Sequence, residues 1–270
     1  MSRKIPGTNN SKDEVVNISQ VAVTLYTVHE YCKNASDLAA TVRKIREIGY
    51  PAVQISQVGP IPPEEILKIV TGEGLKICAT HEPGELLFNE PEKVVDRLRT
   101  LGCQFTAYPF PKGINFRDAD SIRDFARKLD KAGATLRKAG ITLAYHNHDI
   151  EFMRFEDTTV LEYLYSHTDP DNLAGEIDTY WIQHGGGDCV EWCRRLRNRL
   201  PLLHIKDYSI TIDRQAVDSD IGQGTLPFGR IIDEAEQSGC RWFIVERDAA
   251  SNPFESLAVS FNYIKAHLAT

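Results

Sequence analysis

The sequence predicts an α/β protein built as a single closed (β/α)8 barrel, and three observations favour this class. Eight short runs rich in apolar and β-branched residues alternate with longer amphipathic segments along the 270 residues. Strict alternation of this kind produces a parallel sheet that is covered by helices. Eight such units fit a barrel of this length, and polar side chains gather where the strand-like runs end, as they do at the catalytic face of such barrels.

No linker rich in serine and glycine divides the chain, so one domain is expected. The strand candidates span residues 21–28, 52–56, 75–80, 103–108, 141–148, 174–178, 202–206 and 242–246. An open doubly wound sheet is the alternative, and it would require a glycine-rich phosphate-binding turn after the first strand. The residues there, Thr27 to Tyr31, contain no glycine. The sequence therefore favours the barrel.

The helix candidates between these strands carry apolar residues at helical spacing. Leu38, Val42, Ile45 and Ile48 form one such stripe, and Gly49 follows it as the expected helix stop. Other helices are expected to end at Gly102, Gly140 and Gly239, and helices are expected to start at the proline-containing segments 62–65 and 252–253.

Charge and hydropathy exclude several classes of protein. The formal net charge of −7 argues against a nucleic acid or an anionic membrane as partner, because phosphate groups are bound through clustered Lys and Arg. No apolar segment reaches the roughly 20 residues that span a bilayer. The polar residues 1–20 lack the apolar centre of a secretory signal, and we expect them to form a disordered extension before a barrel domain at 21–270. The expected compartment is the cytoplasm.

Polar and ionisable side chains gather at the expected carboxyl ends of the strands. The densest group is the segment YHNHDIEF at 145–152, which directly follows an apolar run. Polar groups packed this closely at the end of a strand are costly to bury unless a metal ion or a polar substrate supplies partners. Later strand candidates end in Asp178, His204 and Glu246. A barrel brings such strand ends together at one face.

Asp178, His204 and Glu246 offer the carboxylate and imidazole ligands that suit one divalent ion such as Mn²⁺, Mg²⁺, Co²⁺ or Zn²⁺. Each residue also has a structural alternative. Asp178 could cap a loop, His204 could be satisfied within the core, and Glu246 could pair with Lys206 or Arg247. Because all three lie at strand ends, the sequence favours a shared metal site.

Five segments resemble sugar phosphate isomerase/epimerase-like members of the xylose-isomerase-like TIM barrel superfamily. That superfamily also includes inosose dehydratases, keto-sugar epimerases, hydroxypyruvate isomerases and endonuclease IV. The resemblance covers residues 21–268, and the segments agree in order and spacing. They are YHNHDIEF at 145–152, EIDTYW at 176–181, LLHIKD at 202–207, GQGTLPF at 222–228 and FIVERD at 243–248.

The resemblance implies that Asp178, His204 and Glu246 are three of the metal ligands. Many relatives place a glutamate at the end of strand five as the fourth ligand, but this chain has His146 there. Either His146 or the nearby Glu151 is therefore expected to be the fourth ligand. Relatives of the epimerase type use a pair of glutamates for proton transfer, so this departure argues against a two-glutamate mechanism.

His148 resembles a catalytic histidine of dehydratase relatives, and its position predicts that it points to the same side of the strand as the preceding histidine. We expect His148 to be the base, with Glu151 or Glu246 as its partner, because histidine is suited to proton transfer near neutral pH. Lys206 is expected to stabilise developing negative charge. An ion pair of Lys206 with Asp207 or Glu246 is the alternative.

Four further residues are candidates for substrate binding. His81 is expected to donate a hydrogen bond to the substrate. Trp181, Tyr26 and Tyr108 lie near strand ends and could form a wall for a sugar ring, with ordinary core packing as the alternative.

Together these expectations describe a divalent-metal-dependent isomerase, epimerase or lyase that acts on a sugar, keto-glycoside or inosose. The reaction would begin with removal of a proton next to a carbonyl, and the metal ion would stabilise the resulting enolate. The expected partner is a small sugar or keto-sugar, and homo-oligomer formation is left open. One alternative is a non-catalytic barrel that serves as a binding or assembly subunit. Another is a DNA repair enzyme like endonuclease IV, which the net charge and the small number of candidate ligands disfavour.

Overall fold

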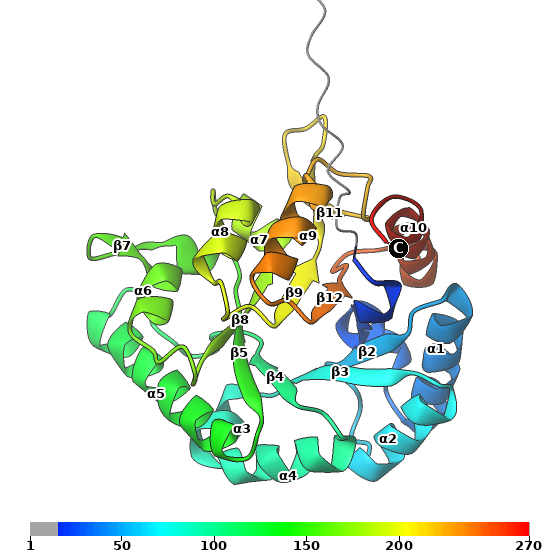
Figure 1. Ribbon diagram of the computed structural model, residues 1–270, viewed down its shortest axis with the longest axis horizontal. Coiled ribbons are helices and arrows are strands. Elements are labelled where there is room, and N and C mark those ends of the chain that lie inside the picture. Colours follow the sequence, from blue (N-terminus) through cyan, green and yellow to red (C-terminus); the bar gives the residue numbers. More distant parts are fainter. Residues whose placement is uncertain (1–15, 270) are drawn as a thin grey trace, which may run out of the picture.

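The computed structural model describes residues 16–269 and shows a closed barrel of eight parallel strands (Figure 1). The barrel strands are β1 (Val21–Thr24), β2 (Ala52–Ile55), β3 (Lys76–His81), β4 (Phe105–Tyr108), β5 (Thr142–His146), β8 (Ala174–Asp178), β9 (Leu202–Ile205) and β12 (Trp242–Val245). Their order around the barrel is β1-β12-β9-β8-β5-β4-β3-β2, and β1 also pairs with β2. The predicted (β/α)8 barrel is confirmed.

Helices cover the outside of the strands (Figure 1). They are α1 (Ala35–Ile48), α2 (Pro63–Gly72), α3 (Gly84–Asn89), α4 (Pro91–Leu101), α5 (Ala119–Lys138), α6 (Val160–Ser166), α7 (Thr179–His184), α8 (Cys189–Arg195), α9 (Phe228–Gln237) and α10 (Pro253–His267). Short 3-10 helices are η1 (Ile18–Gln20), η2 (Leu25–Tyr31) and η3 (Ile150–Phe152). Two antiparallel hairpins pair β6 (Arg154–Phe155) with β7 (Thr158–Thr159) and β10 (Asp207–Ile210) with β11 (Ala216–Ser219).

The helix ends follow the signals in the sequence. Helix α1 ends at Ile48, and Gly49 follows with φ 122°, a conformation that glycine adopts without strain. Helix α4 ends before Gly102, which has a left-handed φ of 65°. Helix α10 begins after Asn252, whose side chain accepts a hydrogen bond from the backbone N–H of Glu255. These predicted boundaries are confirmed.

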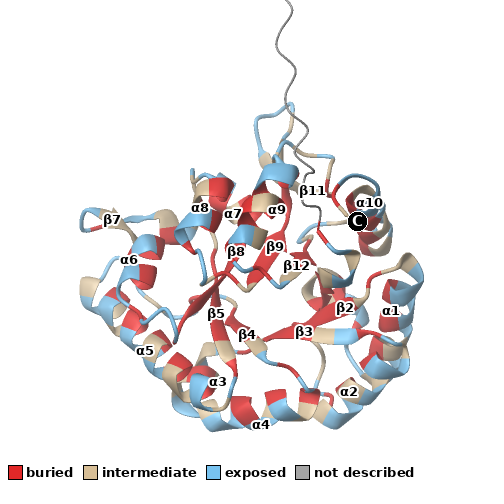
Figure 2. Ribbon diagram, viewed as in Figure 1, coloured by how far each residue is buried: buried red, intermediate tan, exposed pale blue. Residues whose placement is uncertain are grey.

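The apolar core has two parts, one between strands and helices and one inside the barrel. Figure 2 shows the strands almost entirely buried, while the helices alternate between buried and exposed positions. The cluster inside the barrel consists of small or branched residues: Ala22, Ala52, Cys78, Ala79, Ala107, Ala144, Ala174, Leu202 and Ile244. Successive side chains on a strand point to opposite faces, so residues two positions further along point inward again. Those next inward positions hold mostly polar residues and build the site described below.

Two strands end two or more residues earlier than predicted. Strand β1 ends at Thr24, because the Thr24 hydroxyl accepts from the N–H of Tyr26 and the chain turns into η2. Strand β5 ends at His146, so His148 follows the strand instead of lying in it.

The packed part of the chain begins before the expected boundary at Val21. Residues 1–15 of the expected extension lie outside the described residues. Val16, however, is fully buried and forms a parallel bridge with Ala269. The Asn17 side chain accepts from the N–H of Ser19 and caps η1. The first described segment is thus held against the last described one.

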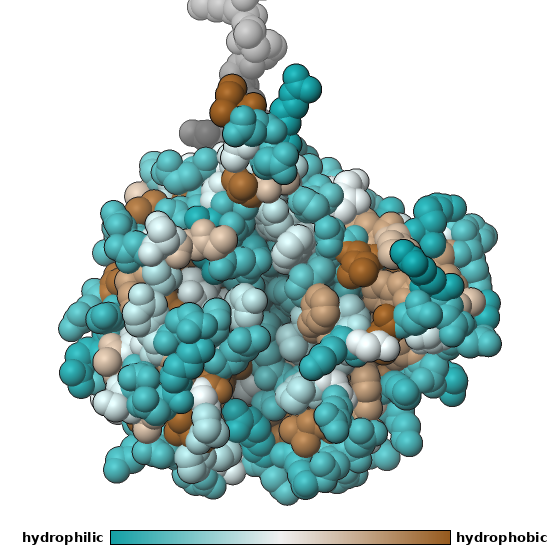
Figure 3. Space-filling model, turned by 180° about the vertical axis from the view of Figure 1, so that it is seen from behind, coloured by the Kyte–Doolittle hydropathy of each residue, from teal (hydrophilic) through white to brown (hydrophobic). Residues whose placement is uncertain are grey.

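One face of the molecule is mostly polar. Figure 3, seen from the side opposite to Figure 1, shows hydrophilic residues over most of this face and apolar ones in separate areas. Among the helices of residues 16–269, none is both long enough and apolar enough to cross a bilayer.

Candidate functional site

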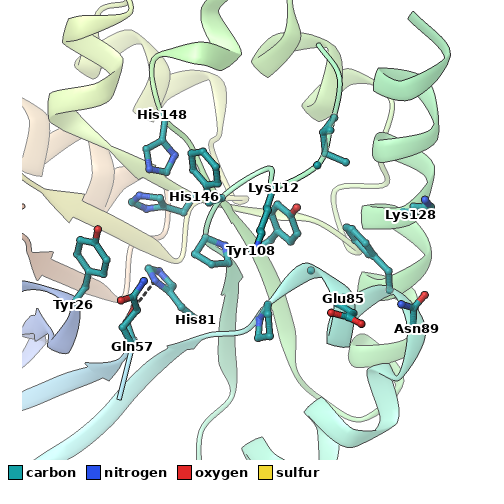
Figure 4. A pocket seen from close by; sticks show the side chains of 18 of the residues that line it. Tyr26, Gln57, His81, Glu85, Asn89, Tyr108, Lys112, Lys128, His146 and His148 are labelled. Atoms are coloured by element: carbon teal, nitrogen blue, oxygen red, sulfur yellow. Dashed lines mark hydrogen bonds between the residues drawn. The ribbon is translucent and has the colours of Figure 1, made fainter. Parts of the chain in front are cut away.

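A cavity of about 1110 Å³ lies at the carboxyl ends of the barrel strands (Figure 4). Residues that end or follow β1 to β5 and β12 line one part of it. They are Tyr26, Ser56, Gln57, His81, Tyr108, His146, His148, Glu246 and Asp248. This is the face of a (β/α)8 barrel at which active sites lie. The predicted position of the site is therefore supported by the geometry.

Four buried residues, of which His146 and Glu246 line this cavity, bring potential metal ligands together. One donor atom each from His146, Asp178, His204 and Glu246 lies within 4.8 Å of the others. His146 Nδ1 and Asp178 Oδ2 are buried and have no hydrogen-bond partner. Glu176 Oε1 is 3.5 Å from His146 Nδ1 but outside hydrogen-bond geometry. Buried polar atoms rarely lack partners, and imidazole and carboxylate donors suit a divalent cation, so this set fits a metal ion.

The two oxygens of Asp178 have different roles. Asp178 Oδ1 accepts a hydrogen bond of 3.0 Å from the N–H of Trp181 and caps the first turn of α7. Asp178 Oδ2 is the unpartnered atom, and it lies 4.0 Å from His204 Nδ1. The Asn147 side chain accepts from the N–H of Asp178 at 3.2 Å and fixes this end of β8. Asp178 therefore caps α7 with one oxygen, as the structural alternative expected, and keeps its other oxygen free to bind an ion.

His204 is oriented by a chain of hydrogen bonds. Gln54 Nε2 donates to Glu176 Oε2 at 2.6 Å, and because a carboxylate only accepts, the amide NH₂ of Gln54 must face Glu176. Gln54 Oε1 then accepts from His204 Nε2 at 2.9 Å. His204 Nδ1 faces the carboxylate of Glu246 with a hydrogen bond. With the proton fixed on Nε2, Nδ1 is the nitrogen that can bind a metal ion.

Glu176 belongs to this site although the sequence analysis did not select it. It is fully buried, and its Oε1 accepts from His81 Nε2 at 2.6 Å. Strands β2 and β8 are not neighbours in the barrel, so the Gln54–Glu176 bond crosses the interior. Glu176 stands two residues before Asp178 on one strand, and the alternation of side chains could have predicted that both point inward.

The site contains a second set of potential metal ligands, which shares two histidines with the first. Donor atoms of His81, His146, Glu176 and His204 also lie within 4.8 Å of one another. Here both oxygens of Glu176 already accept hydrogen bonds, from Gln54 and from His81. We therefore assign this deeper set to hydrogen bonding that supports the first set.

The charges of these groups depend on one another. Burial would raise the pKa of Glu176, but the imidazoles of His204 and His81 hold it below its usual range. Burial would lower the pKa of His204, but the carboxylates of Glu176 and Glu246 raise it to about 9. Burial and the neighbouring His204 lower the pKa of His146 to about 4. His146 is therefore neutral and has a lone pair to offer.

His148 lies beside this group and lines the cavity. Its ring centroid is 5.0 Å from that of His146, so it does lie on the same side as predicted, although it follows the strand. Burial and then His146 lower the pKa of His148 to about 2. Its Nδ1 is buried without a hydrogen-bond partner. His148 is thus a neutral imidazole with a free nitrogen next to the donor group.

Glu151 is held in protein hydrogen bonds. Its Oε1 accepts from the Tyr145 hydroxyl at 2.6 Å, and its Oε2 accepts from the N–H of His148 at 2.8 Å. It is in neither set of potential metal ligands and does not line the cavity. Of the two candidates for the fourth ligand, the structure brings His146 into the group and leaves Glu151 to fix the loop that carries His148.

Lys206 is fully buried, and its ammonium pairs with the carboxylate of Asp248 and lies 3.7 Å from Glu246 Oε1. The alternative ion pair with Glu246 is therefore present. The alternative ion pair of Lys206 with Asp207 is absent from the described residues. One oxygen of Asp207 instead accepts hydrogen bonds from the N–H groups of Gly222 at 3.0 Å and Gly224 at 2.9 Å.

The expected substrate-binding residues divide into two groups. Tyr26, Tyr108 and His81 line the cavity. Trp181 does not, although its ring centroid is 5.2 Å from that of His148.

The hydrogen bonding of His81 differs from the expectation. His81 Nε2 bonds to Glu176, and His81 Nδ1 bonds to the Ser56 hydroxyl at 2.9 Å. No ring nitrogen remains for a substrate, because the barrel places a carboxylate and a hydroxyl at the two ends of the ring.

Comparisons with known proteins agree with this architecture. The sequence model of the xylose isomerase-like TIM barrel family matches residues 42–267. An inosose dehydratase from Mesomycoplasma hyopneumoniae is 24% identical in an alignment 210 residues long, which covers 69% of this chain and 68% of that protein.

Two solved structures show the same fold. A sugar phosphate isomerase/epimerase from Parabacteroides distasonis has a TM-score of 0.79 at 24% identity, over 98% of this chain and 100% of that one. A xylose isomerase-like TIM barrel protein from Mycobacterium smegmatis in complex with magnesium has a TM-score of 0.73 at 16% identity, over 92% of this chain and 96% of that one. With the family match spanning most of the barrel, the chain belongs to the xylose isomerase-like TIM barrel family.

Proposed function

We propose that this protein is a divalent-metal-dependent enzyme that removes a proton next to the carbonyl of a keto-sugar or inosose. One observation carries the proposal: four buried donor residues leave His146 Nδ1 and Asp178 Oδ2 unpartnered, beside the free Nδ1 of His148. The names of the relatives, an inosose dehydratase and a sugar phosphate isomerase/epimerase, support a substrate of this class.

His146, Asp178, His204 and Glu246 are the residues that would hold the ion. A Mn²⁺, Mg²⁺, Co²⁺ or Zn²⁺ ion bound there supplies Lewis-acid polarisation of the substrate carbonyl. Binding of the ion to His204 Nδ1 requires that this nitrogen lose its proton. The hydrogen bond to Gln54 keeps the other proton of the ring on Nε2.

His148 is the proposed proton acceptor. Burial and the neighbouring His146 lower its pKa, so it is neutral, and its unpartnered Nδ1 is available to accept a proton. Negative charge that develops on a substrate oxygen nearby raises the pKa of the imidazole, and the proton transfer becomes favourable as that charge forms.

Lys206 helps to stabilise the negative charge that develops on the substrate oxygen, but it does not contact the substrate itself. Burial would lower its pKa, but the carboxylates of Glu246, Asp178 and Asp248 hold the pKa above its usual range. Lys206 is therefore charged, and it acts through Glu246 and Asp248, because it does not line the cavity.

The arrangement favours elimination of water over epimerisation. Epimerisation needs a second group that returns the proton to the opposite face of the carbon. Among the described imidazole and carboxyl groups beside this part of the cavity, Glu246 belongs to the donor set, Asp248 pairs with Lys206, and both nitrogens of His81 are hydrogen-bonded. His148 is left as the base with an unpartnered nitrogen. It can take the proton from carbon and pass it to the hydroxyl that leaves the neighbouring carbon as water.

The test compares metal content and proton exchange. We expect near one divalent ion per chain in the wild type, and deuterium incorporation from D₂O into scyllo-inosose next to its carbonyl, followed by NMR. Asp178→Asn should lose both the ion and the exchange. His148→Asn should keep the ion and lose exchange by about 100-fold or more.

His267→Asn is the matched control, because His267 is exposed on α10 and outside the cavity. It should behave as the wild type does. A wild type that binds no ion and gains no thermal stability from added Mn²⁺, Mg²⁺, Co²⁺ or Zn²⁺ contradicts the metal site. Full exchange in His148→Asn contradicts the assignment of the base.

A further inference from the structure

The cavity continues beyond the candidate metal ligands into a part that the proposed reaction does not use. In Figure 4, Glu85, Asn89 and Lys128 lie on the side away from Tyr26 and His148, with Tyr108 and Lys112 between the two ends. The walls of this second part, here called the distal arm, are mostly apolar: Pro83, Phe88, Tyr108, Pro109, Phe110 and Ile114.

The size of the cavity exceeds what one sugar ring needs. Pockets for drug-sized ligands have volumes of about 300–1,000 Å³. This cavity has about 1110 Å³, whereas a hexose or inosose has only about a dozen non-hydrogen atoms. A free monosaccharide next to His148 would leave the distal arm filled only with water.

The walls of the distal arm favour a flat apolar group. The partly buried ring of Phe88 on α3 stacks on Tyr108 at the end of β4, with centroids 5.4 Å apart and an interplanar angle of 23°. Tyr108 is only 1% exposed, so its ring supports Phe88 from behind. Gly84 adjoins the Tyr108 ring so closely that a Cβ there would lie 2.2 Å from Tyr108 Cε2. A bare backbone is therefore required beside Tyr108, and the accessible part of the Phe88 ring is the aromatic surface that another ring can contact.

Phe110 stands where the distal arm meets the catalytic group. Phe110 is 53% exposed, and the centroid of its ring lies 5.1 Å from that of His148 in an edge-to-face arrangement. An exposed aromatic ring in the wall of a cavity, beside the proposed base, loses water contact only when a ligand covers it. A ligand at His148 that extends over Phe110 would do so.

We propose that the distal arm is a subsite for an aromatic or apolar group joined to the sugar. The natural substrate is then a conjugate of a keto-sugar, such as a glycoside with an apolar aglycone, and not a free monosaccharide. This inference rests on the proposed function, because it places the sugar ring beside His148. The polar ends of Glu85, Asn89 and Lys128 suit hydroxyl groups at the far end of that substituent.

Binding of two unreactive sugars tests the subsite. Methyl β-D-glucopyranoside and 4-nitrophenyl β-D-glucopyranoside both lack the ketone, so neither is turned over. By isothermal titration calorimetry with the full chain in Mn²⁺, we expect the nitrophenyl compound to bind about tenfold more tightly or better. Phe110→Ala and Phe88→Leu should each reduce that ratio to about two or three, with little change for the methyl compound.

Tyr31→Ala is the control, because Tyr31 is an aromatic residue of similar exposure, 47%, outside the cavity. It should keep the wild-type ratio. Equal affinities for the two glucosides in the wild type overturn the subsite and leave the proposed function intact. A preference for the nitrophenyl compound that persists in both Phe110→Ala and Phe88→Leu also overturns the subsite and leaves the proposed function intact. Failure of both glucosides to bind at all contradicts the sugar site itself, and the subsite with it.

Discussion

At the scale of single residues, the site contains two kinds of buried polar atom, those that have a hydrogen-bond partner in the protein and those that have none. Glu176 and Gln54 are fully buried and their side chains are hydrogen-bonded to each other. His146 Nδ1 and Asp178 Oδ2 are equally buried but unpartnered. A buried group without a partner is costly, so the difference identifies which atoms await a ligand and which atoms support them.

Gln54 should control the affinity for the metal ion. Gln54→Leu removes the acceptor that fixes the proton on His204 Nε2, and loss of such a supporting hydrogen bond weakens metal binding about tenfold or more. Titration with Mn²⁺ or Co²⁺ measures the affinity. Gln215→Leu, an exposed glutamine, is the control. Equal affinities for Gln54→Leu and the wild type would show that Gln54 does not orient His204.

Glu151 should make stability depend on pH. Burial raises its pKa from 4.5 to about 6, so the folded protein binds this proton more tightly than the unfolded chain does. The contribution to stability is complete below pH 4.5 and is lost as the pH rises through 6. From the size of the shift, the wild type should lose about 2 kcal/mol relative to Glu151→Gln across this window.

Urea unfolding at several pH values between 4 and 7 measures how the difference in unfolding free energy between the wild type and Glu151→Gln changes with pH. The hydrogen bond lost in the variant lowers its stability by the same amount at every pH, so it does not affect this change. Glu47→Gln removes an exposed glutamate on α1 and serves as the control for charge. Parallel stability curves for the wild type and Glu151→Gln would contradict the raised pKa.

At the scale of elements, the close approach of α5 to the barrel depends on one glycine. A Cβ on Gly133 would lie 1.8 Å from the backbone oxygen of Asn172, just before β8. The sequence predicted α5 from its apolar stripe, but nothing in that stripe shows that its backbone touches a distant segment. Strand β8 carries Glu176 and Asp178, so this contact also positions the site.

Gly133→Ala should destabilise the fold by about 1–3 kcal/mol, because the added methyl group meets rigid backbone. Gly229 on α9 is the matched control, since nothing lies within 4 Å of a Cβ there. Gly229→Ala should gain up to about 1 kcal/mol from helix propensity. Chemical unfolding compares the two, and similar effects from both would refute the role of the close contact.

At the scale of the whole molecule, closure of the barrel joins parts that are distant in sequence. Strand β1 pairs with β12, and the bridge between Val16 and Ala269 holds the first and last described segments together. Closure also brings β2 opposite β8, which creates the bond between Gln54 and Glu176.

Val16 should contribute to global stability through this closure. Val16→Ala removes two buried methyl groups and should cost about 2 kcal/mol in the free energy of unfolding. Val259→Ala on α10, where the side chain is 36% exposed, should change stability by no more than about 0.5 kcal/mol. Equal effects in thermal or urea unfolding would mean that the first segment does not stabilise the barrel.

The sequence by itself determined the architecture and the position of the site. The alternation of strand-like and helical runs predicted eight parallel strands, and glycines such as Gly49 and Gly102 predicted helix ends. These signals are local, because side-chain periodicity and backbone conformation act within a few residues. The rule that polar residues end barrel strands then predicted that Asp178, His204 and Glu246 meet, and the structure brings them within reach of one ion.

Only the tertiary structure decided how the remaining polar groups are used. It placed His146 in the donor group and committed Glu151 to Tyr145 and the N–H of His148. It also occupied both ring nitrogens of His81 and opened the distal arm beyond Phe110. Which donor meets which acceptor is set when the barrel closes and strands far apart in sequence face each other across its interior, and no local pattern records that geometry.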